Sequence, residues 1–196
     1  MKPPCAEFVP GYGDVNAHFH VIGDHPGVHG GGDTGVPFTN DAGLRLQAAL
    51  EAAGLLERAG EEPQVDRTYL SYLHMCVSES GTPADGDSTE MERYLDAELR
   101  AIAAHVLVPV GERTTAYVLR NYTARPASEA TAMETLHGEE LRGSGFLVVP
   151  VRDPAEWDDD HHDRLVAGLT ELQRTDYRRE VDLGRFVAGD EPYHVR

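Results

Sequence analysis

Four short apolar segments recur along the chain, and each runs into a turn that is followed by a stretch with helical periodicity. These segments are residues 17–22, 67–73, 105–110 and 146–151. The third is almost unbroken in its apolar character, which is typical of a strand buried on both faces of a sheet. Strands that alternate with helices favour right-handed crossovers and helices on both faces of the sheet. The sequence therefore predicts an α/β fold, a three-layer αβα arrangement around a mainly parallel four-stranded central sheet.

The helix after the first strand has the clearest boundaries. Asn40 or Asp41 is a plausible N-cap, the helix reaches about residue 53, and Gly54 is suited to its C-cap. Helical spacing predicts an apolar face that carries Leu44, Gln47, Ala48 and Leu55.

A second helix is expected after the polar segment 77–87, with Ser88 or Thr89 as its cap. Its inward face is predicted from the spacing of Met91, Tyr94, Leu95, Leu99 and Ile102. Further helices are expected over residues 112–120 and 160–174, the last with Leu165, Val166, Leu169 and Leu172 facing inward. Residues 123–134 are ambiguous.

Length and composition favour one domain. The chain has 196 residues, of which 40% are apolar, which is enough for one core but too little for two large domains. We expect residues 1–174 to form a single domain and residues 175–196 a C-terminal extension packed on it. No apolar run could cross a bilayer, and the N-terminus lacks a signal peptide's apolar stretch. We expect a cytoplasmic protein that is a monomer and has no contact with a membrane.

Acidic residues dominate the charge of the chain. Asp and Glu number 34 against 17 Lys and Arg, which gives a net charge of −17, and Lys2 is the single lysine. Such a charge ordinarily argues against nucleic acid, because phosphates are bound by Lys and Arg. In molar salt, however, the Debye length shrinks to about 3 Å and surface repulsion is screened. Acidic charge spread along the whole chain favours this second interpretation, a halophilic host whose charge does not describe the ligand.

Cysteines and histidines give no strong metal signature. Cys5 and Cys76 are too few for a disulfide framework or a four-cysteine metal site. Two histidine-rich stretches match no strong zinc pattern, and solvation at the surface accounts for them better: His18, His20, His25 and His29, and the run His161-His162-Asp163. We expect no metal and no cofactor.

Ligands of parallel sheets bind at the carboxyl ends of the strands. The segments that follow the four strands are residues 23–27, 72–76, 111–114 and 152–157. The first opens the loop 23–38, which is rich in Gly, Pro, Asp and His. We therefore expect the working site around this loop.

Several motifs in these segments resemble a known family. Residues 21–27 read Val-Ile-Gly-Asp-His-Pro-Gly, and residues 34–44 read Thr-Gly-Val-Pro-Phe-Thr-Asn-Asp-Ala-Gly-Leu. This pair resembles the uracil-DNA glycosylase superfamily, most closely the branch with an iron–sulfur cluster. That branch carries a Gly-Glu-x-Pro-Gly turn and then Gly-x-Pro-Phe-x-x-x-Ala-Gly. Residues 69–76, 106–111 and 146–155 continue the similarity in the family's order, over roughly residues 17–172.

The resemblance implies an enzyme that extrudes a base from DNA and cleaves its bond to the sugar. Asp24 would be the carboxylate that stabilises the sugar cation or orients water. Phe38 would stack on the base, beside Asn40. The backbone amides around His25, Pro26 and Gly27 would bind the base carbonyl or a phosphate. Trp157 could fill the gap left by the base, with Arg152 as a second DNA contact, although ordinary packing accounts for Trp157 better.

The chain departs from the family at three places. Asp153-Pro154-Ala155 stands where the family has its His-Pro-Ser turn, so the usual donor to the departing base is missing unless Asp153 is protonated. Tyr72 stands where the family has an Asn that reads the uracil edge, and a phenol cannot supply a matched donor and acceptor. Met91 falls near the fourth cluster ligand, so we expect no cluster. His25 could replace the missing donor if Asp24 keeps it protonated.

Three functions remain open from the sequence. The first is a DNA glycosylase-like hydrolase that removes uracil or another damaged base. The second is a catalytically impaired glycosylase-like module that binds nucleic acid or a nucleotide. The third is an α/β enzyme acting on a small molecule that merely shares the sheet. For single residues, Asp24 could instead brace the turn, Phe38 could belong to the core, and Asp153 could cap a helix.

Overall fold

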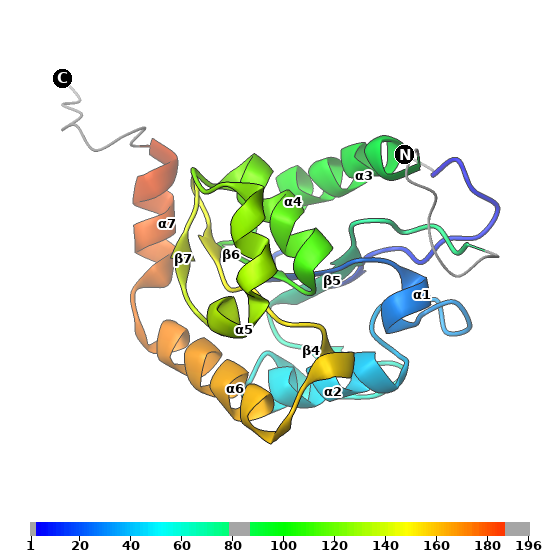
Figure 1. The fold of residues 1–196 in the computed structure, drawn as a ribbon, viewed down its shortest axis with the longest axis horizontal. Helices are drawn as coiled ribbons and strands as arrows, with labels where there is room; N and C mark the ends of the chain where they lie inside the picture. Colours follow the sequence, from blue (N-terminus) through cyan, green and yellow to red (C-terminus); the bar gives the residue numbers. More distant parts are fainter. Residues whose placement is uncertain (1–2, 79–86, 187–196) are drawn as a thin grey trace.

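The computed structural model describes residues 3–78 and 87–186 of the chain (Figure 1). Its main sheet has the strand order β1-β5-β2-β6-β8-β7. The four inner strands run parallel to one another: β5 (Thr68–Tyr72), β2 (Phe19–Gly23), β6 (Val106–Pro109) and β8 (Leu147–Val148). The outer strands β1 (Tyr12–Gly13) and β7 (Leu141–Arg142) pair antiparallel with their neighbours. The mainly parallel four-stranded core of the sheet is therefore confirmed, and two short edge strands are added to it.

The inner strands are buried on both faces, as their composition predicts. Every residue of β2 and of β6 is buried. In register, Phe19 of β2 lies beside Thr68 of β5 and Val106 of β6. The carboxyl ends of β2, β6 and β8 consequently lie along one edge of the sheet.

Helices cover both faces of this sheet (Figure 1). One core cluster joins the sheet to α2 (Asp41–Ala52), α6 (Asp159–Arg174) and α7 (Tyr177–Phe186). A second cluster lies on the other face and joins α3 (Asp87–Ile102), α4 (Glu112–Tyr122) and α5 (Met133–Leu136). The predicted three-layer αβα arrangement is therefore confirmed.

The remaining elements are short. The helix α1 (Pro26–His29) follows β2, and β3 (Leu56–Arg58) forms a hairpin with β4 (Gln64–Val65). The ambiguous segment 123–134 contains the 3-10 helix Ala127–Ala132 and the start of α5. A further 3-10 turn spans Pro154–Glu156. No helix among residues 3–78 and 87–186 is both long and apolar enough to span a membrane.

The predicted N-cap of helix α2 is confirmed, and its predicted inward face is confirmed in part. The side chain of Asn40 caps the helix by accepting a hydrogen bond from the Gly43 amide at 2.8 Å. Of the predicted inward face, Gln47 and Leu55 are buried as expected, whereas Leu44 is half-buried and Ala48 is exposed. The residues that face the sheet are Gly43, Leu46, Gln47, Ala49 and Leu50. Their spacing also fits a helix, and the docking of α2 against α6 decides between the two faces.

The C-terminal segment contributes to the core. Tyr177 and Val181 of α7 are buried in the first cluster, and the Tyr177 ring lies 5.5 Å from the ring of Phe19. Residues 187–196 of the expected extension lie outside the described residues, as do residues 79–86 of the predicted polar segment.

Candidate active site

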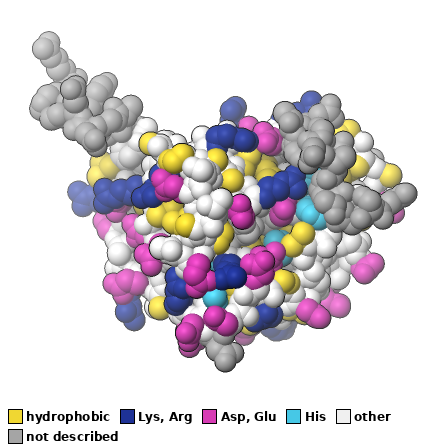
Figure 2. All heavy atoms as spheres, viewed as in Figure 1, with side chains coloured by type: hydrophobic (Ala, Val, Ile, Leu, Met, Phe, Trp, Pro, Cys, Tyr) yellow, Lys and Arg dark blue, Asp and Glu magenta, His cyan; other side chains and the backbone are white. Residues whose placement is uncertain are grey.

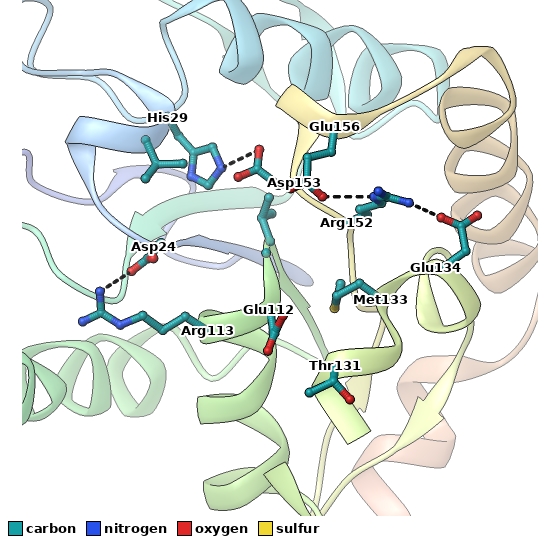
Figure 3. A pocket seen from close by; sticks show the side chains of 13 residues that line it. Asp24, His29, Glu112, Arg113, Thr131, Met133, Glu134, Arg152, Asp153 and Glu156 are labelled. Atoms are coloured by element: carbon teal, nitrogen blue, oxygen red, sulfur yellow. Dashed lines mark hydrogen bonds and ion pairs between the residues drawn. The ribbon is translucent and has the colours of Figure 1, made fainter. Parts of the chain in front are cut away.

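A cavity of about 410 Å³ opens at the carboxyl ends of β2, β6 and β8 (Figure 3). Its polar lining includes Asp24, His29, Glu112, Arg113, Glu134, Arg152, Asp153 and Glu156. Apart from Glu134 of α5, these residues follow three of the four predicted strands. The volume is within the usual range of small-ligand sites, roughly 300–1,000 Å³. The edge of the sheet that was expected to carry the chemistry therefore carries the cavity.

Asp24 follows the last residue of β2 and faces this cavity. Its side chain is 18% exposed, and Nη1 of Arg113 lies 3.1 Å from its Oδ1. Arg113 stands in the first turn of α4, two residues after its N-cap residue Gly111. The cavity thus holds a carboxylate with a guanidinium directly beside it.

Asp153 faces the same cavity from the turn after β8. Its carboxylate accepts a hydrogen bond from the Ala155 amide at 2.9 Å and lies 3.7 Å from Nε2 of His29. Burial alone would raise the pKa of Asp153, but His29 and the Ala155 amide together hold the pKa below its usual value. Asp153 is therefore an anion that accepts hydrogen bonds, and it cannot replace the histidine donor expected at this turn.

The turn that carries Asp153 is held rigidly from several sides. His137 accepts a hydrogen bond from the Arg152 amide at Nδ1 (3.0 Å) and pairs through Nε2 with the carbonyl of His161 (2.7 Å). Burial lowers the pKa of His137 to about 4, so its ring is neutral and can do both. Arg45 donates to the carbonyls of Pro154 and Trp157. A reacting group on this turn is consequently fixed before a ligand arrives.

Trp157 is one of the residues that hold this turn in place, so its side chain is not available as a DNA wedge. The side chain is buried, and its indole N–H donates to the Arg152 carbonyl at 2.8 Å. The wedge prediction is therefore wrong, because the ring is used to close the turn. Arg152 does line the cavity, but its guanidinium is paired with Glu134 and, at 3.3 Å, with Glu156.

His25 does not line the cavity, and its ring caps the short helix α1. Its Nδ1 accepts the Gly27 amide at 3.1 Å and caps α1. Burial lowers the pKa of His25 more than the Asp24 charge raises it, so the ring is neutral. The expected protonation by Asp24 is corrected on this ground, since desolvation outweighs one neighbouring carboxylate.

The backbone amides of α1 are also used within the turn. The amides of Val28 and His29 donate to the His25 carbonyl, and the Gly27 amide donates to the His25 ring. Pro26 has no amide hydrogen. The amides of residues 26–29 are therefore not available to a base carbonyl or a phosphate, which leaves the His25 amide as the remaining candidate of the predicted set.

Phe38 and Tyr72 lie behind the cavity wall, and neither side chain is exposed. Phe38 has φ +64°, a left-handed conformation that costs a non-glycine residue of order 1–3 kcal/mol. Its amide donates to the Tyr72 hydroxyl at 2.8 Å, and its carbonyl accepts from Gln47 at 2.8 Å. A Cβ on Gly23 would lie 2.8 Å from the Phe38 ring, which explains the glycine at the end of β2.

The residues predicted to bind the base, Phe38, Asn40 and Tyr72, are engaged in contacts within the protein. Burial raises the pKa of Tyr72, and its neutral hydroxyl donates to the Gly30 carbonyl at 2.9 Å, so it is fully used by the protein. The side chain of Asn40 is also engaged within the protein. Its Nδ2 donates to the Val28 carbonyl, and its Oδ1 accepts from the Gly43 amide and so caps α2. Phe38 would stack on a base only after the ring of His29, 5.4 Å away, had moved.

The sequence predictions missed His29 and Arg113 as cavity residues. Arg113 lies inside the segment 111–114 that the strand pattern had marked, so the signal was present but no residue was chosen. His29 was grouped with histidines expected at the surface, and that expectation is wrong for His20, His25, His29 and His161, all of which are buried. No group of three metal-ligating side chains is found among residues 3–78 and 87–186.

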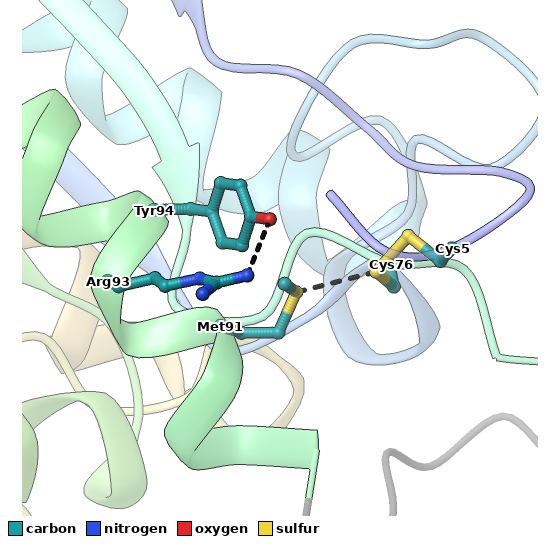
Figure 4. The surroundings of a disulfide bond; sticks show 5 residues. All are labelled: Cys5, Cys76, Met91, Arg93 and Tyr94. Atoms are coloured by element: carbon teal, nitrogen blue, oxygen red, sulfur yellow. Dashed lines mark hydrogen bonds between the residues drawn. A yellow bond between two sulfur atoms is a disulfide. The ribbon is translucent and has the colours of Figure 1, made fainter. Parts of the chain in front are cut away.

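The cysteines do not fit an iron–sulfur cluster. Cys5 and Cys76 form a disulfide, and the chain has no further cysteine (Figure 4). Met91 of α3 lies against this disulfide, with its Sδ 3.4 Å from the Sγ of Cys76. The disulfide ties the N-terminal segment to the chain after β5, where Val9 and Val77 also make backbone hydrogen bonds.

Acidic side chains outnumber basic ones around the cavity. Its lining holds five carboxylates (Asp24, Glu112, Glu134, Asp153, Glu156) against two guanidiniums. On the face of the molecule shown in Figure 2, acidic side chains are interspersed with arginines. This setting favours positive charge that develops in the cavity, whereas the binding of a polyanion would depend on screening by salt.

Comparison with known proteins places the fold and the site in a family. The sequence profile of the uracil DNA glycosylase superfamily matches residues 10–163. The type-5 uracil-DNA glycosylase of Pyrobaculum aerophilum is 29% identical over 153 residues, which are 75% of this chain and 65% of that protein. The type-5 uracil-DNA glycosylase of Thermus thermophilus is 29% identical over 133 residues, 65% of this chain and 61% of that protein.

The type-5 uracil-DNA glycosylase of Mycobacterium leprae is 29% identical over 127 residues, 61% of this chain and 56% of that protein. The chain thus spans less than two thirds of the length of these relatives. The family profile itself begins just before β1, ends inside α6 and includes every segment that lines the cavity. On this match, the chain belongs to the uracil DNA glycosylase superfamily.

Proposed function

We propose that the protein is a DNA glycosylase that hydrolyses the bond between uracil, or another damaged base, and its sugar. One observation carries the proposal: Asp24 and Asp153, from turns more than a hundred residues apart in sequence, face a single cavity at the carboxyl ends of β2 and β8. The names of the related type-5 uracil-DNA glycosylases support the same activity. DNA is the proposed partner, and a cytoplasmic monomer the proposed state.

Cleavage of this bond develops positive charge on the sugar, because the electron pair leaves with the base. Asp24 is the proposed carboxylate beside the sugar, where it stabilises the cation and orients the attacking water. Arg113, 3.1 Å from Asp24, keeps that carboxylate in place from the other side of the cavity mouth. Asp153 and its rigid turn form the opposite wall.

The test measures release of free base from oligonucleotides that carry a single uracil, single- and double-stranded, at low and at high KCl. We expect the wild-type protein to release uracil, and Asp24→Ala to be slower by about 10²–10³-fold, the usual effect of losing one electrostatic group from an active site. Asp33→Ala is the matched control, since Asp33 is exposed and does not line the cavity. No release from substrates with several different lesions would contradict the proposal.

A second candidate is a glycosylase-like module that binds nucleic acid without cleaving it. The burial of Phe38 behind His29 favours it, because a base then lacks its expected stacking surface. Binding of uracil-containing or abasic DNA without turnover would support this candidate, and turnover would eliminate it.

A further inference from the structure

A departing base needs a hydrogen-bond donor, and the usual donors of this cavity are engaged. The base leaves with the electron pair of the broken bond and must be stabilised as an anion. Arg113 is paired with Asp24, and Arg152 with Glu134 and Glu156. Asp153 is an anion that can only accept. Among the titratable side chains that line the cavity, this leaves the imidazole of His29.

The backbone of His29 is held firmly at the end of α1. Its amide donates to the His25 carbonyl at 3.3 Å. The neighbouring Val28 carbonyl accepts from the Asn40 side chain at 2.8 Å. The position of this short helix is therefore fixed from two directions.

The ring of His29 is backed by two aromatic rings. The Phe38 ring lies 5.4 Å away, tilted by 34°, and the Tyr72 ring lies 6.4 Å away, nearly parallel at 13°. The Tyr72 hydroxyl is held by the Phe38 amide and the Gly30 carbonyl, and both rings are fully buried. The imidazole is thus packed against two buried rings on the side away from the cavity.

The nitrogens of His29 are buried and poorly satisfied. Neither Nδ1 nor Nε2 makes a hydrogen bond within residues 3–78 and 87–186, and the nearest carboxylate oxygen, on Asp153, lies 3.7 Å from Nε2. Buried polar groups are nearly always hydrogen-bonded, and an exception calls for an explanation such as a catalytic role. A gap of this length is too long for a hydrogen bond.

We propose that His29 is the catalytic residue that donates a hydrogen bond to the departing base, with the Asp153 carboxylate opposite it as the group that orients its ring. This inference rests on the proposed glycosylase function and assigns the donor that the Asp153 turn itself cannot supply. It also explains why Phe38 is covered: the ring supports the imidazole, and the imidazole faces the base.

The bond between C1′ and the base nitrogen breaks, and its electron pair goes to the base. The base leaves as an anion that accepts a hydrogen bond from an N–H of His29, and it takes up a proton from solvent. A water molecule adds to C1′ and loses a proton to Asp24, from which that proton returns to solvent. The net change is one water consumed, one free base released and one abasic sugar formed.

Several other charged groups share the cavity with this histidine. They are Asp24 after β2, Glu112 and Arg113 of α4, Glu134 of α5, and Arg152, Asp153 and Glu156 after β8. A pH profile of the wild-type protein alone would mix their titrations. The test therefore compares variants.

The experiment measures base release as a function of pH for the wild-type protein, His29→Phe, His29→Gln and the control His162→Phe. We expect His29→Phe, which keeps a flat ring but no donor, to lower kcat by about 10²–10⁴-fold with a nearly unchanged KM. His29→Gln should recover part of this loss through its amide donor. His162 is partly exposed and outside the cavity, so its replacement should leave the rate unchanged.

A second readout does not depend on turnover. Carbon-13 NMR of the carboxyl groups should show a higher pKa of Asp153 in His29→Phe than in the wild-type protein, because His29 is one of the groups that lower it. Base release that survives His29→Phe, or an unchanged pKa of Asp153 in that variant, overturns the inference while the glycosylase function stands. No release by the wild-type protein overturns both.

Discussion

Tyr72→Phe separates a structural role of Tyr72 from the base-reading role that its sequence position suggests. The hydroxyl accepts the Phe38 amide at 2.8 Å and donates to the Gly30 carbonyl at 2.9 Å. Phenylalanine keeps the ring but lacks the hydroxyl, so both hydrogen bonds are lost. The Phe38 amide then has no acceptor, although Phe38 is fully buried. An unsatisfied buried donor costs about 1–3 kcal/mol and the second hydrogen bond contributes about 1 kcal/mol. We therefore expect a loss of about 2–4 kcal/mol in the free energy of unfolding.

The assay is urea unfolding of Tyr72→Phe and of the control Tyr12→Phe at one salt concentration. The Tyr12 hydroxyl makes a single hydrogen bond, to the Pro63 carbonyl at 3.0 Å, and lies outside the cavity, so its loss should cost only about 1 kcal/mol. The slope of the unfolding free energy against urea should be unchanged in both. A Tyr72→Phe protein that is as stable as the wild type but has lost base release would refute the structural reasoning and restore the base-reading role.

Three further predictions concern stability. Replacing both Cys5 and Cys76 with Ser opens a loop with a sequence separation of 71, and the chain-entropy relation gives a loss of up to about 4 kcal/mol, measured by urea unfolding; an effect below about 1 kcal/mol would contradict it. Burial raises the pKa of Glu98 to about 7, although hydrogen bonds with Ser71 and the Gly11 backbone lower it in part. The folded protein therefore still holds a proton at pH values above 4.5, where the unfolded chain releases it. The unfolding free energy of the wild type relative to Glu98→Gln should therefore fall as pH rises from about 4.5 to about 7, and a flat difference would refute this. With a net charge of −17, the melting temperature should rise between about 0.1 M and about 2 M KCl as self-repulsion is screened, and a falling melting temperature would argue against the halophilic interpretation.

Much of the fold could be predicted because it is encoded locally. The inner strands are apolar runs, and β2 and β6 are buried along their whole length. Asn40 is a capping residue at the position where α2 needs one. The strands β1 and β7 escaped prediction because two residues carry no periodicity, and they exist only as partners of β5 and β8.

The candidate site could be located from the sequence but not assembled. The rule that ligands bind at the carboxyl ends of parallel strands led to Asp24 and Asp153, and both face the cavity. The roles of His29, Tyr72 and Trp157 depend on contacts between segments far apart in the chain. The Tyr72 hydroxyl is hydrogen-bonded to the backbone of Phe38 and Gly30, at sequence separations of 34 and 42. Residue type alone does not reveal such partners.

The most direct test of the account is the structure of the Asp24→Ala protein bound to DNA with a single uracil, determined in high salt. We expect an extruded uracil in the cavity at the carboxyl ends of β2, β6 and β8, with one of its oxygens within hydrogen-bond distance of His29 and its sugar next to position 24. Uracil that remains stacked in the duplex, or DNA bound to another face of the molecule with this space empty, would contradict it.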